Sequence, residues 1–298
     1  MVQNIEWWHS ELKAYGGDHE GNLNSSLADI NATYGISDKW NLSVDVMAGN
    51  RSMDFYRDAN IHHRDENKIG IGDTRFTLRY LMENTTFGPG QRVFIGGGLV
   101  IPSNNSLTEN PFKLGKAGEP HTHFNLSEGV FKGHGEFQYF RRTDGSIFPG
   151  GVLKVDVPLE TNQYGFKPGV QFSGAALLYF QTKSFWGGIP FFQMLGQYRN
   201  PAIWDGEEAP NSGGSVLQLG GGLTFATNGY LLTVSARTPV YFNASVTSQE
   251  EIEVTSKTDV WGLSLSIRKS FSLFKLKLDE KSEDRKSTRL NSSHTSIS

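Results

Sequence analysis

The stretch from Ser215 to Phe242 constrains the fold of this chain more than any other stretch. Its first half alternates between bulky apolar residues and small or polar ones. The apolar face comprises Leu217, Leu219, Leu223 and Phe225. Asn228-Gly229 follows, a dipeptide that favours a type I′ turn, and the return strand alternates again. Strands of about twelve residues are roughly twice the usual globular length, and they match the length that crosses a bilayer when tilted. The stretch therefore predicts one long, two-faced hairpin.

The same two-faced pattern recurs along the chain, and no segment of comparable length shows a 3.6-residue period. The expected strands lie at 2–15, 27–35, 40–46, 69–82, 93–101, 121–142, 153–159, 165–181, 192–199, 215–226, 230–242 and 261–271. Segment 121–142 is ambiguous, because Lys132-Gly133-His134-Gly135 can either divide it into two strands or bend a single one.

Loop lengths resolve this ambiguity. The connections at 36–39, 83–91, 183–188 and 227–229 are mostly tight, whereas those at 49–67, 102–120, 200–213 and 243–257 are long. Outer-membrane barrels place short turns on the periplasmic side and long loops outside. Short and long connections alternate only if 121–142 is one bent strand. We therefore predict an all-β, antiparallel up-and-down transmembrane β-barrel of about 12 strands over residues 1–271, with both ends on the periplasmic side.

Composition fits this fold. A mean hydropathy of −0.40 and the lack of any run of 18 apolar residues exclude a helical membrane protein. A barrel is compatible with both, because only alternate residues face lipid. The net charge of −3 argues against a nucleic-acid partner. The absence of cysteine suits an oxidising compartment. We expect a bacterial outer-membrane location with lipids as partners, and the oligomeric state stays open.

The two ends of the chain carry their own signals. Met1-Val2-Gln3-Asn4 lacks the charged and apolar regions of a signal peptide. A secreted barrel needs one, so either the start is truncated or the outer-membrane interpretation is wrong. At the other end, DRKSTRLNSSH at 284–294 resembles a conceptual translation of a short-read sequencing adapter. We expect 272–283 to be a polar extension and 284–298 to be a disordered sequencing artefact.

Several short motifs resemble those of the outer-membrane barrels grouped under meta-pathway phenol degradation. They are GIGDTRFTLRY at 70–80, NSGGSVLQLGGGL at 211–223, TPVYF at 238–242 and a final strand that ends at Phe271. The resemblance implies a transporter through which small, hydrophobic or aromatic molecules diffuse passively or by facilitated diffusion. The chain departs from these barrels by continuing past Phe271. Two alternatives stay open: a structural or surface-interaction barrel with a closed lumen, and a soluble β-sandwich that serves as a binding module.

In a barrel, charged residues opposite the apolar faces line the pore. The pore-lining candidates carry both signs: Asp29, Asp45, Arg75, Arg79, Glu136, Lys154, Asp156, Arg237 and Arg268. In a soluble sheet the same residues would form a solvated face. The barrel interpretation predicts that they pair where they approach closely.

The sequence offers little that points to catalysis or to a cofactor. His121 and His123 share one face of a strand and, with His134 or with His62 and His63, can bind a transition metal. Solvated histidines at a loop edge are the favoured alternative. Residues 1–271 contain no His-x-Ser pair of the outer-membrane lipase type, and the chain has no GxSxG or HExxH pattern. We expect neither an enzyme nor a cofactor.

Overall fold

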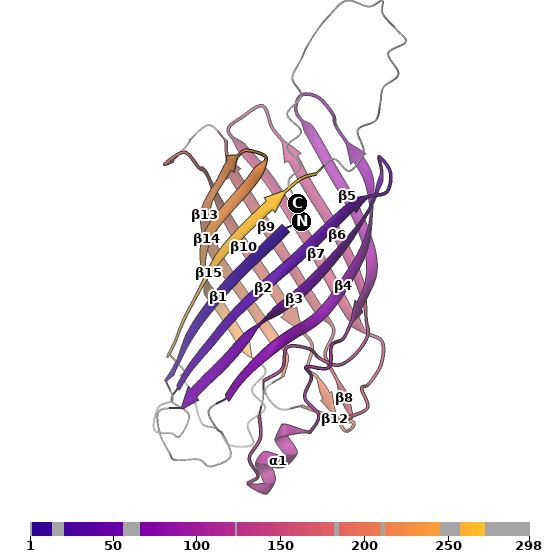
Figure 1. The fold of residues 1–298 in the computed structure, drawn as a ribbon, viewed down its shortest axis with the longest axis vertical. Helices are drawn as coiled ribbons and strands as arrows, with labels where there is room; N and C mark the ends of the chain where they lie inside the picture. The colour runs from indigo at the N-terminus through magenta and orange to yellow at the C-terminus, as the bar shows by residue number, and fades with distance from the viewer. Residues whose placement is uncertain are drawn as a thin grey trace, which may run out of the picture.

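The structure of the chain, a computed structural model, describes residues 2–13, 21–55, 66–122, 124–181, 185–209, 212–244 and 257–271. Among these residues, twelve long antiparallel strands form one closed barrel (Figure 1). They are β1 (Val2–Lys13), β2 (Gly21–Gly35), β3 (Trp40–Phe55), β4 (Glu66–Asn84), β5 (Gly90–Ile101), β6 (Lys132–Arg142), β7 (Ile147–Pro158), β9 (Gln171–Phe180), β10 (Ile189–Arg199), β13 (Gly214–Thr227), β14 (Tyr230–Ala244) and β15 (Lys257–Lys269).

The strands follow one another around the barrel in chain order, and β1 closes it by pairing with β15. Val2 lies opposite Asn31 of β2 on one side and opposite Arg268 of β15 on the other. The predicted hairpin is β13 and β14. Its turn residues Asn228 and Gly229 have φ values of 47° and 79°, which agree with the positive φ that a type I′ turn requires at both positions. The predicted fold class is therefore confirmed.

The expectation of one bent strand over 121–142 is wrong. Strand β6 begins only at Lys132. The backbone N–H groups of Leu126 and Ser127 both donate to the carbonyl oxygen of Asn105, at 3.0 and 3.1 Å. Gly129, with a φ of 69°, then turns the chain back toward β6. Residues 124–131, called the inner segment below, bury Leu126, Ser127 and Val130. The predicted number of twelve barrel strands is still correct, because 121–142 supplies one barrel strand, β6.

The expected strand over 165–181 is also divided. Pro168-Gly169 separates β8 (Phe166–Lys167) from β9, and a side chain at Gly169 would overlap the backbone at Asn200. Strand β8 instead joins β11 (Ile203–Trp204) and β12 (Glu207–Glu208) in a small second sheet. This sheet and helix α1 (Pro111–Ala117) lie together at one end of the barrel (Figure 1) and are called the cap below.

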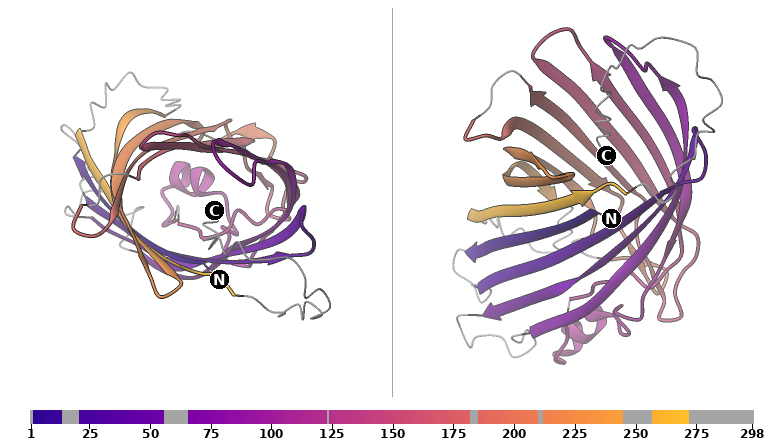
Figure 2. Two further views of the ribbon diagram at one scale, coloured as in Figure 1. Left: turned by 90° about the horizontal axis from the view of Figure 1, so that it is seen from above. Right: turned by 45° about the horizontal axis from the view of Figure 1, so that its top comes forward.

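The cap has its own small apolar core. Ala202, Trp204 and Ala209 are buried there, and Leu107, Phe112 and Phe166 pack against them. The Trp204 and Phe166 rings lie 4.8 Å apart. Viewed along the barrel, α1 falls within the outline of the strands (Figure 2). The cap therefore stands over the lumen at the end where the long connections lie.

The two faces of the barrel wall differ in chemistry. Outward positions carry exposed apolar side chains, among them Phe76, Leu78, Ile95, Leu99, Leu153, Phe172, Met194, Val234, Leu263 and Ile267. An apolar surface that extends from β4 to β10 and over β14 and β15 is far larger than the patches that water-exposed proteins tolerate. Near the short-turn end, the ring centroids of Trp40 and Tyr80 lie 4.8 Å apart, as expected for an interfacial aromatic belt. No helix in the described part of the chain has the length and apolar character to cross a membrane.

Candidate functional site

The candidate site is the lumen, and one of its walls is held by ion pairs. The Arg79 guanidinium of β4 binds the Glu136 carboxylate of β6, with Nη2 at 3.3 Å from Oε2. Strand β5 lies between them, and there Gly96 is in register with both residues. Because Gly96 has no side chain, Arg79 can cross β5 to reach Glu136. Lys154 Nζ of β7 lies 3.7 Å from the same carboxylate oxygen, Oε2.

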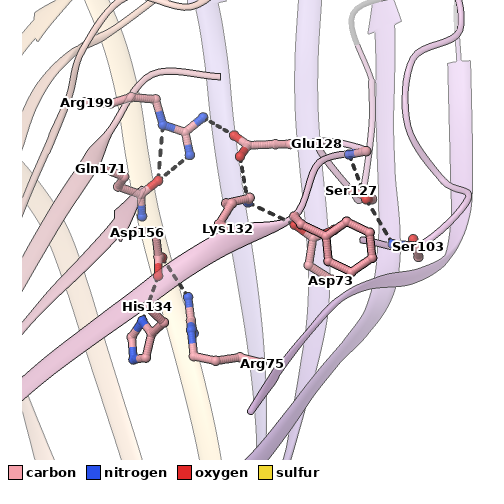
Figure 3. A network of polar contacts seen from close by, with 12 residues as sticks. Asp73, Arg75, Ser103, Ser127, Glu128, Lys132, His134, Asp156, Gln171 and Arg199 are labelled. Carbon is pink, nitrogen blue, oxygen red and sulfur yellow. Dashed lines mark hydrogen bonds and ion pairs between the residues drawn. The ribbon is translucent and has the colours of Figure 1, made fainter. Parts of the chain in front are cut away.

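A second pair lies on the same wall, nearer the long-loop end. Arg75 Nη2 is 2.8 Å from Asp156 Oδ2, and His134 Nδ1 is 2.7 Å from Asp156 Oδ1 (Figure 3). Asp156 and the His134 ring are almost completely buried. One carboxylate of β7 thus joins a guanidinium from β4 to an imidazole from β6.

The inner segment adds a third group of charges, from inside the barrel. Glu128 contacts Lys132 Nζ at 2.6 Å and Arg199 Nη1 at 2.5 Å. Lys132 also binds Asp73 at 2.9 Å, and Arg199 donates to Gln171 (Figure 3). Charges of alternating sign therefore run from β4 to β10 across the inside of the barrel.

Two of the cavities formed by the described residues lie in the lumen. The larger, of about 530 Å³, lies beside the charged residues, and its lining includes Asp29, Asp45, Arg51, Arg75, Glu128, Lys132, Asp156 and Arg199. The smaller, of about 460 Å³, lies along the adjoining wall, from β7 to β14. Its lining is mostly small, apolar or amide-bearing: Val152, Ser173, Ala175, Leu195, Gln197, Val216 and Gln218, with Lys154 and Arg237 at its ends. The two walls thus offer a solute very different surroundings.

The structure brings five of the nine pore-lining candidates into direct contact: Arg75, Arg79, Glu136, Lys154 and Asp156. Asp29 and Asp45 lie on β2 and β3 and line the larger cavity, where Asp45 accepts from the Asn31 amide. Arg237 lies on β14 at the smaller cavity. Arg268 is on β15, directly opposite Leu231 of β14 and far around the wall from the paired cluster.

The sequence reasoning missed a second set of charged residues: Arg51, Asp73, Glu128, Lys132 and Arg199. Three of these had a usable signal. Asp73 shares the two-residue period of Arg75 and Arg79, Arg199 shares that of Gln193 and Gln197, and Lys132 shares that of Glu136. Arg51 falls in an expected loop, and Glu128 falls in the inner segment, where a strand was expected.

The histidines do not gather into a metal site within the described residues, where no group of three or more potential ligands occurs. The His121 ring lies 3.0 Å from the Glu119 carbonyl oxygen, and His134 is bound to Asp156. His62, His63 and His123 lie outside the described residues. A metal at His121 and His123 stays an untested hypothesis.

The cap holds a charged group of its own, outside the membrane-spanning strands. Asp205 accepts from the Asn110 amide at 3.1 Å and from Lys113 Nζ at 3.3 Å. These hydrogen bonds, with the charge of Lys113, lower the pKa of the Asp205 carboxyl from its ordinary value. Asn110 also caps helix α1, so Asp205 ties the small sheet to the start of the helix.

A closed antiparallel barrel with an apolar exterior and a charged, hollow interior has the architecture of an outer-membrane β-barrel channel. The chain is similar in structure to the COG4313 outer membrane channel from Pseudomonas putida F1. The TM-score is 0.61 at 14% identity, over 90% of this chain and 94% of that one. A weaker likeness links it to the KdgM porin, with a TM-score of 0.41, 8% identity, and coverage of 90% and 99%.

No family model and no curated protein matches the chain. At these identities the likeness is one of fold. The soluble β-sandwich is excluded, because every long strand among the described residues belongs to a single closed sheet.

Proposed function

We propose that the chain is a channel of the bacterial outer membrane through which small solutes, hydrophobic or aromatic ones included, cross by passive or facilitated diffusion. The apolar belt around the barrel supports the membrane location, since that surface is stable only in lipid. The likeness in fold to an outer membrane channel agrees with it. The short motifs that resemble the meta-pathway phenol degradation barrels add support for aromatic solutes.

One observation carries the proposal: the contrast between the two walls of the lumen. The ion pairs of β4, β6 and β7 satisfy one another, so that wall presents fixed and mostly neutralised charge. The adjoining wall, from β7 to β13, presents Val152, Ala175, Leu195 and Val216 beside the amides of Gln197 and Gln218. Such a surface accepts an apolar body and hydrogen-bonds to a polar group on it.

Swelling of proteoliposomes with a matched solute pair tests this function. Methyl glucoside and phenyl glucoside share a sugar that keeps both from crossing lipid unaided, and they differ in the aromatic ring. A channel with an apolar wall should admit phenyl glucoside as fast as methyl glucoside or faster, although phenyl glucoside is larger. Entry in order of size alone would contradict a preference for aromatic solutes. Swelling no faster than in protein-free liposomes, for any solute, would contradict the channel itself.

A structural or surface-interaction barrel with a closed lumen is the second candidate. It is favoured by the inner segment and by the cap, which stands over the long-loop end of the lumen on its own apolar core. The swelling experiment separates the two functions, because a closed barrel would admit neither glucoside.

A further inference from the structure

The inner segment places one carboxylate between two cations of the barrel wall. Lys132 belongs to β6 and Arg199 to β10, with β7 and β9 between them. Glu128 lies within 2.6 Å of both (Figure 3). Its side chain is 15% exposed, compared with 11% for Lys132 and 35% for Arg199. The carboxylate is therefore largely withdrawn from water but lies next to a cavity of about 530 Å³.

Neighbours on the barrel wall also hold these two cations in place. Asp73 of β4 binds Lys132 Nζ at 2.9 Å. Gln171 of β9 accepts from Arg199 Nε at 3.1 Å and also from Nη2, and Nη1 points to Glu128. Both positive groups would therefore keep their orientation if Glu128 moved away, which is the preorganisation that an anion-binding site needs.

We propose that Lys132 and Arg199 form an anion-binding site in the lumen, that Glu128 fills it as an internal carboxylate, and that a small carboxylate solute competes with Glu128 for it. This rests on the proposed function, because the solute must reach the lumen. When the solute binds, the inner segment is released from two of its contacts with the wall. The site thus makes small carboxylates a preferred class of solute. Their binding changes the position of the inner segment.

The energetics allow such an exchange. Removing one partner of a buried ion pair is costly, but replacing one carboxylate by another keeps the pair, and the hydration that the incoming carboxylate loses is offset by the hydration that Glu128 regains. What Glu128 gains over a free solute is its tether to the wall. A short tether corresponds to an effective concentration of roughly millimolar or more. A free carboxylate should therefore compete in that range, and more easily in the Glu128→Gln variant, which lacks the internal carboxylate.

Propionate is the free analogue of a glutamate side chain, and 1-propanol is its neutral counterpart. The purified full chain is placed in planar bilayers, and the chloride current is measured as potassium propionate is added. In the Glu128→Gln channel, propionate should block the current saturably, at a concentration at least about tenfold below that needed in the original channel. Adding Arg199→Gln to this variant should abolish the block. Propanol should have no effect on any of the channels.

Glu160→Gln is the matched control. Glu160 accepts from the backbone N–H of Phe131 at 3.2 Å and is exposed, so this change removes a carboxylate beside the inner segment without touching Lys132 or Arg199. It should leave the propionate response unchanged. A Glu128→Gln channel that responds like Glu160→Gln, or that changes its chloride selectivity without any block by propionate, would overturn the proposed site. An original channel that carries neither ions nor glucosides would instead overturn the proposed function.

A second measurement needs no change at Glu128. The chain contains no cysteine, so Asn125→Cys would introduce its only thiol, within the inner segment. If propionate displaces the segment, it should raise the rate at which a charged thiol reagent modifies this residue, compared with chloride at the same ionic strength. An equal rate in the two salts would contradict the displacement.

Discussion

Arg79 and Glu136 form an ion pair across a strand that belongs to neither of them. Gly96 of β5 is in register with both residues, and a Cβ atom there would lie 3.1 Å from Thr77 Cγ2 and 3.2 Å from Arg79 Cγ. The pair thus depends on a missing side chain. The ion pairing on the charged wall of the lumen therefore depends on Gly96 as well as on the charged residues.

Gly96→Val should therefore destabilise the barrel. The added side chain would push Arg79 away from Glu136, and overpacking of this kind costs about 1–3 kcal/mol. Urea unfolding of the refolded barrel in lipid measures the loss. Gly97→Val is the control, because the nearest neighbour of a Cβ at Gly97 would be the His134 carbonyl oxygen, at 3.8 Å. Equal losses for the two variants would mean that crowding at Gly96 is not the cause.

Arg79→Gln should cost more than the loss of one surface charge. It leaves Glu136, whose side chain is 1% exposed, with only Gln138 and the more distant Lys154 as partners. Breaking a buried pair in this way costs about 3–5 kcal/mol. The double variant Arg79→Gln with Glu136→Gln should recover most of that stability. The single variant should also shift reversal potentials toward cations. A double variant less stable than Arg79→Gln would contradict this account.

Leu78→Arg should impair membrane insertion, because Leu78 is 42% exposed on the outer face. A lipid-facing arginine costs about 2–4 kcal/mol near the bilayer midplane. Ser173→Arg is the matched change on the inner face, where Ser173 lines the smaller cavity, and it should fold nearly normally. Heat-modifiable gel mobility reports the folded fraction of each. Normal folding of Leu78→Arg together with failure of Ser173→Arg would mean that the two faces are assigned the wrong way round.

Trp204→Ala should loosen the cap and leave the barrel intact. Trp204 is the largest side chain of the small core, and removing a buried tryptophan costs about 3–5 kcal/mol locally. Limited proteolysis should then cut within 102–120 while the barrel keeps its folded gel mobility. Ile203→Ala, at a position 40% exposed, is the control and should resist the protease like the unaltered chain. Loss of the barrel band with Trp204→Ala would show that the cap and the barrel unfold together.

The Asp205 carboxyl should make the cap sensitive to acid. Hydrogen bonds from Asn110 and Lys113 lower its pKa, so its contribution is fully present above the unfolded value of about 3.9 and is lost as the pH falls through the folded value. Cutting of the cap by an acid protease should increase over that range, modestly, because the group is exposed to solvent. Asp205→Asn should flatten this pH dependence, and a profile as steep as that of the unaltered chain would rule Asp205 out as its origin.

The barrel strands were predictable because their side chains alternate between two environments with a period of two residues. Each strand must separate lipid from lumen, so alternation identified the strands, apart from the ambiguity at 121–142, and placed Arg75 on the face opposite Phe76 and Leu78. Loop lengths gave the even count. The same logic failed at the inner segment, where Phe124, Leu126 and Val130 fall at even positions and imitate a strand. Leu126 and Val130 are buried inside the barrel and Phe124 is partly buried, and periodicity does not distinguish lipid from a buried interior.

The site was less predictable than the fold. Alternation says which residues face inward, and it does not say which of them meet. Arg75 reaches Asp156, 81 residues later, because β5 places only Gly98 and Val100 at the intervening inward positions. Glu128 could not be found at all, because its role comes from a turn at Gly129 that returns the chain to the wall. Contacts that depend on glycine gaps and turns require the three-dimensional register.

The pairing of β1 with β15 also bears on the timing of folding. Val2 of β1 pairs on one side with β2, the next strand in the chain. On the other side it pairs with Arg268 of β15, near the far end of the barrel sequence. Until β1 and β15 pair, each of them presents an unpaired backbone edge that invites aggregation. Contacts of such long sequence separation form slowly. In a chain of this design we therefore expect the seam between β1 and β15 to close last, once the whole barrel sequence is present.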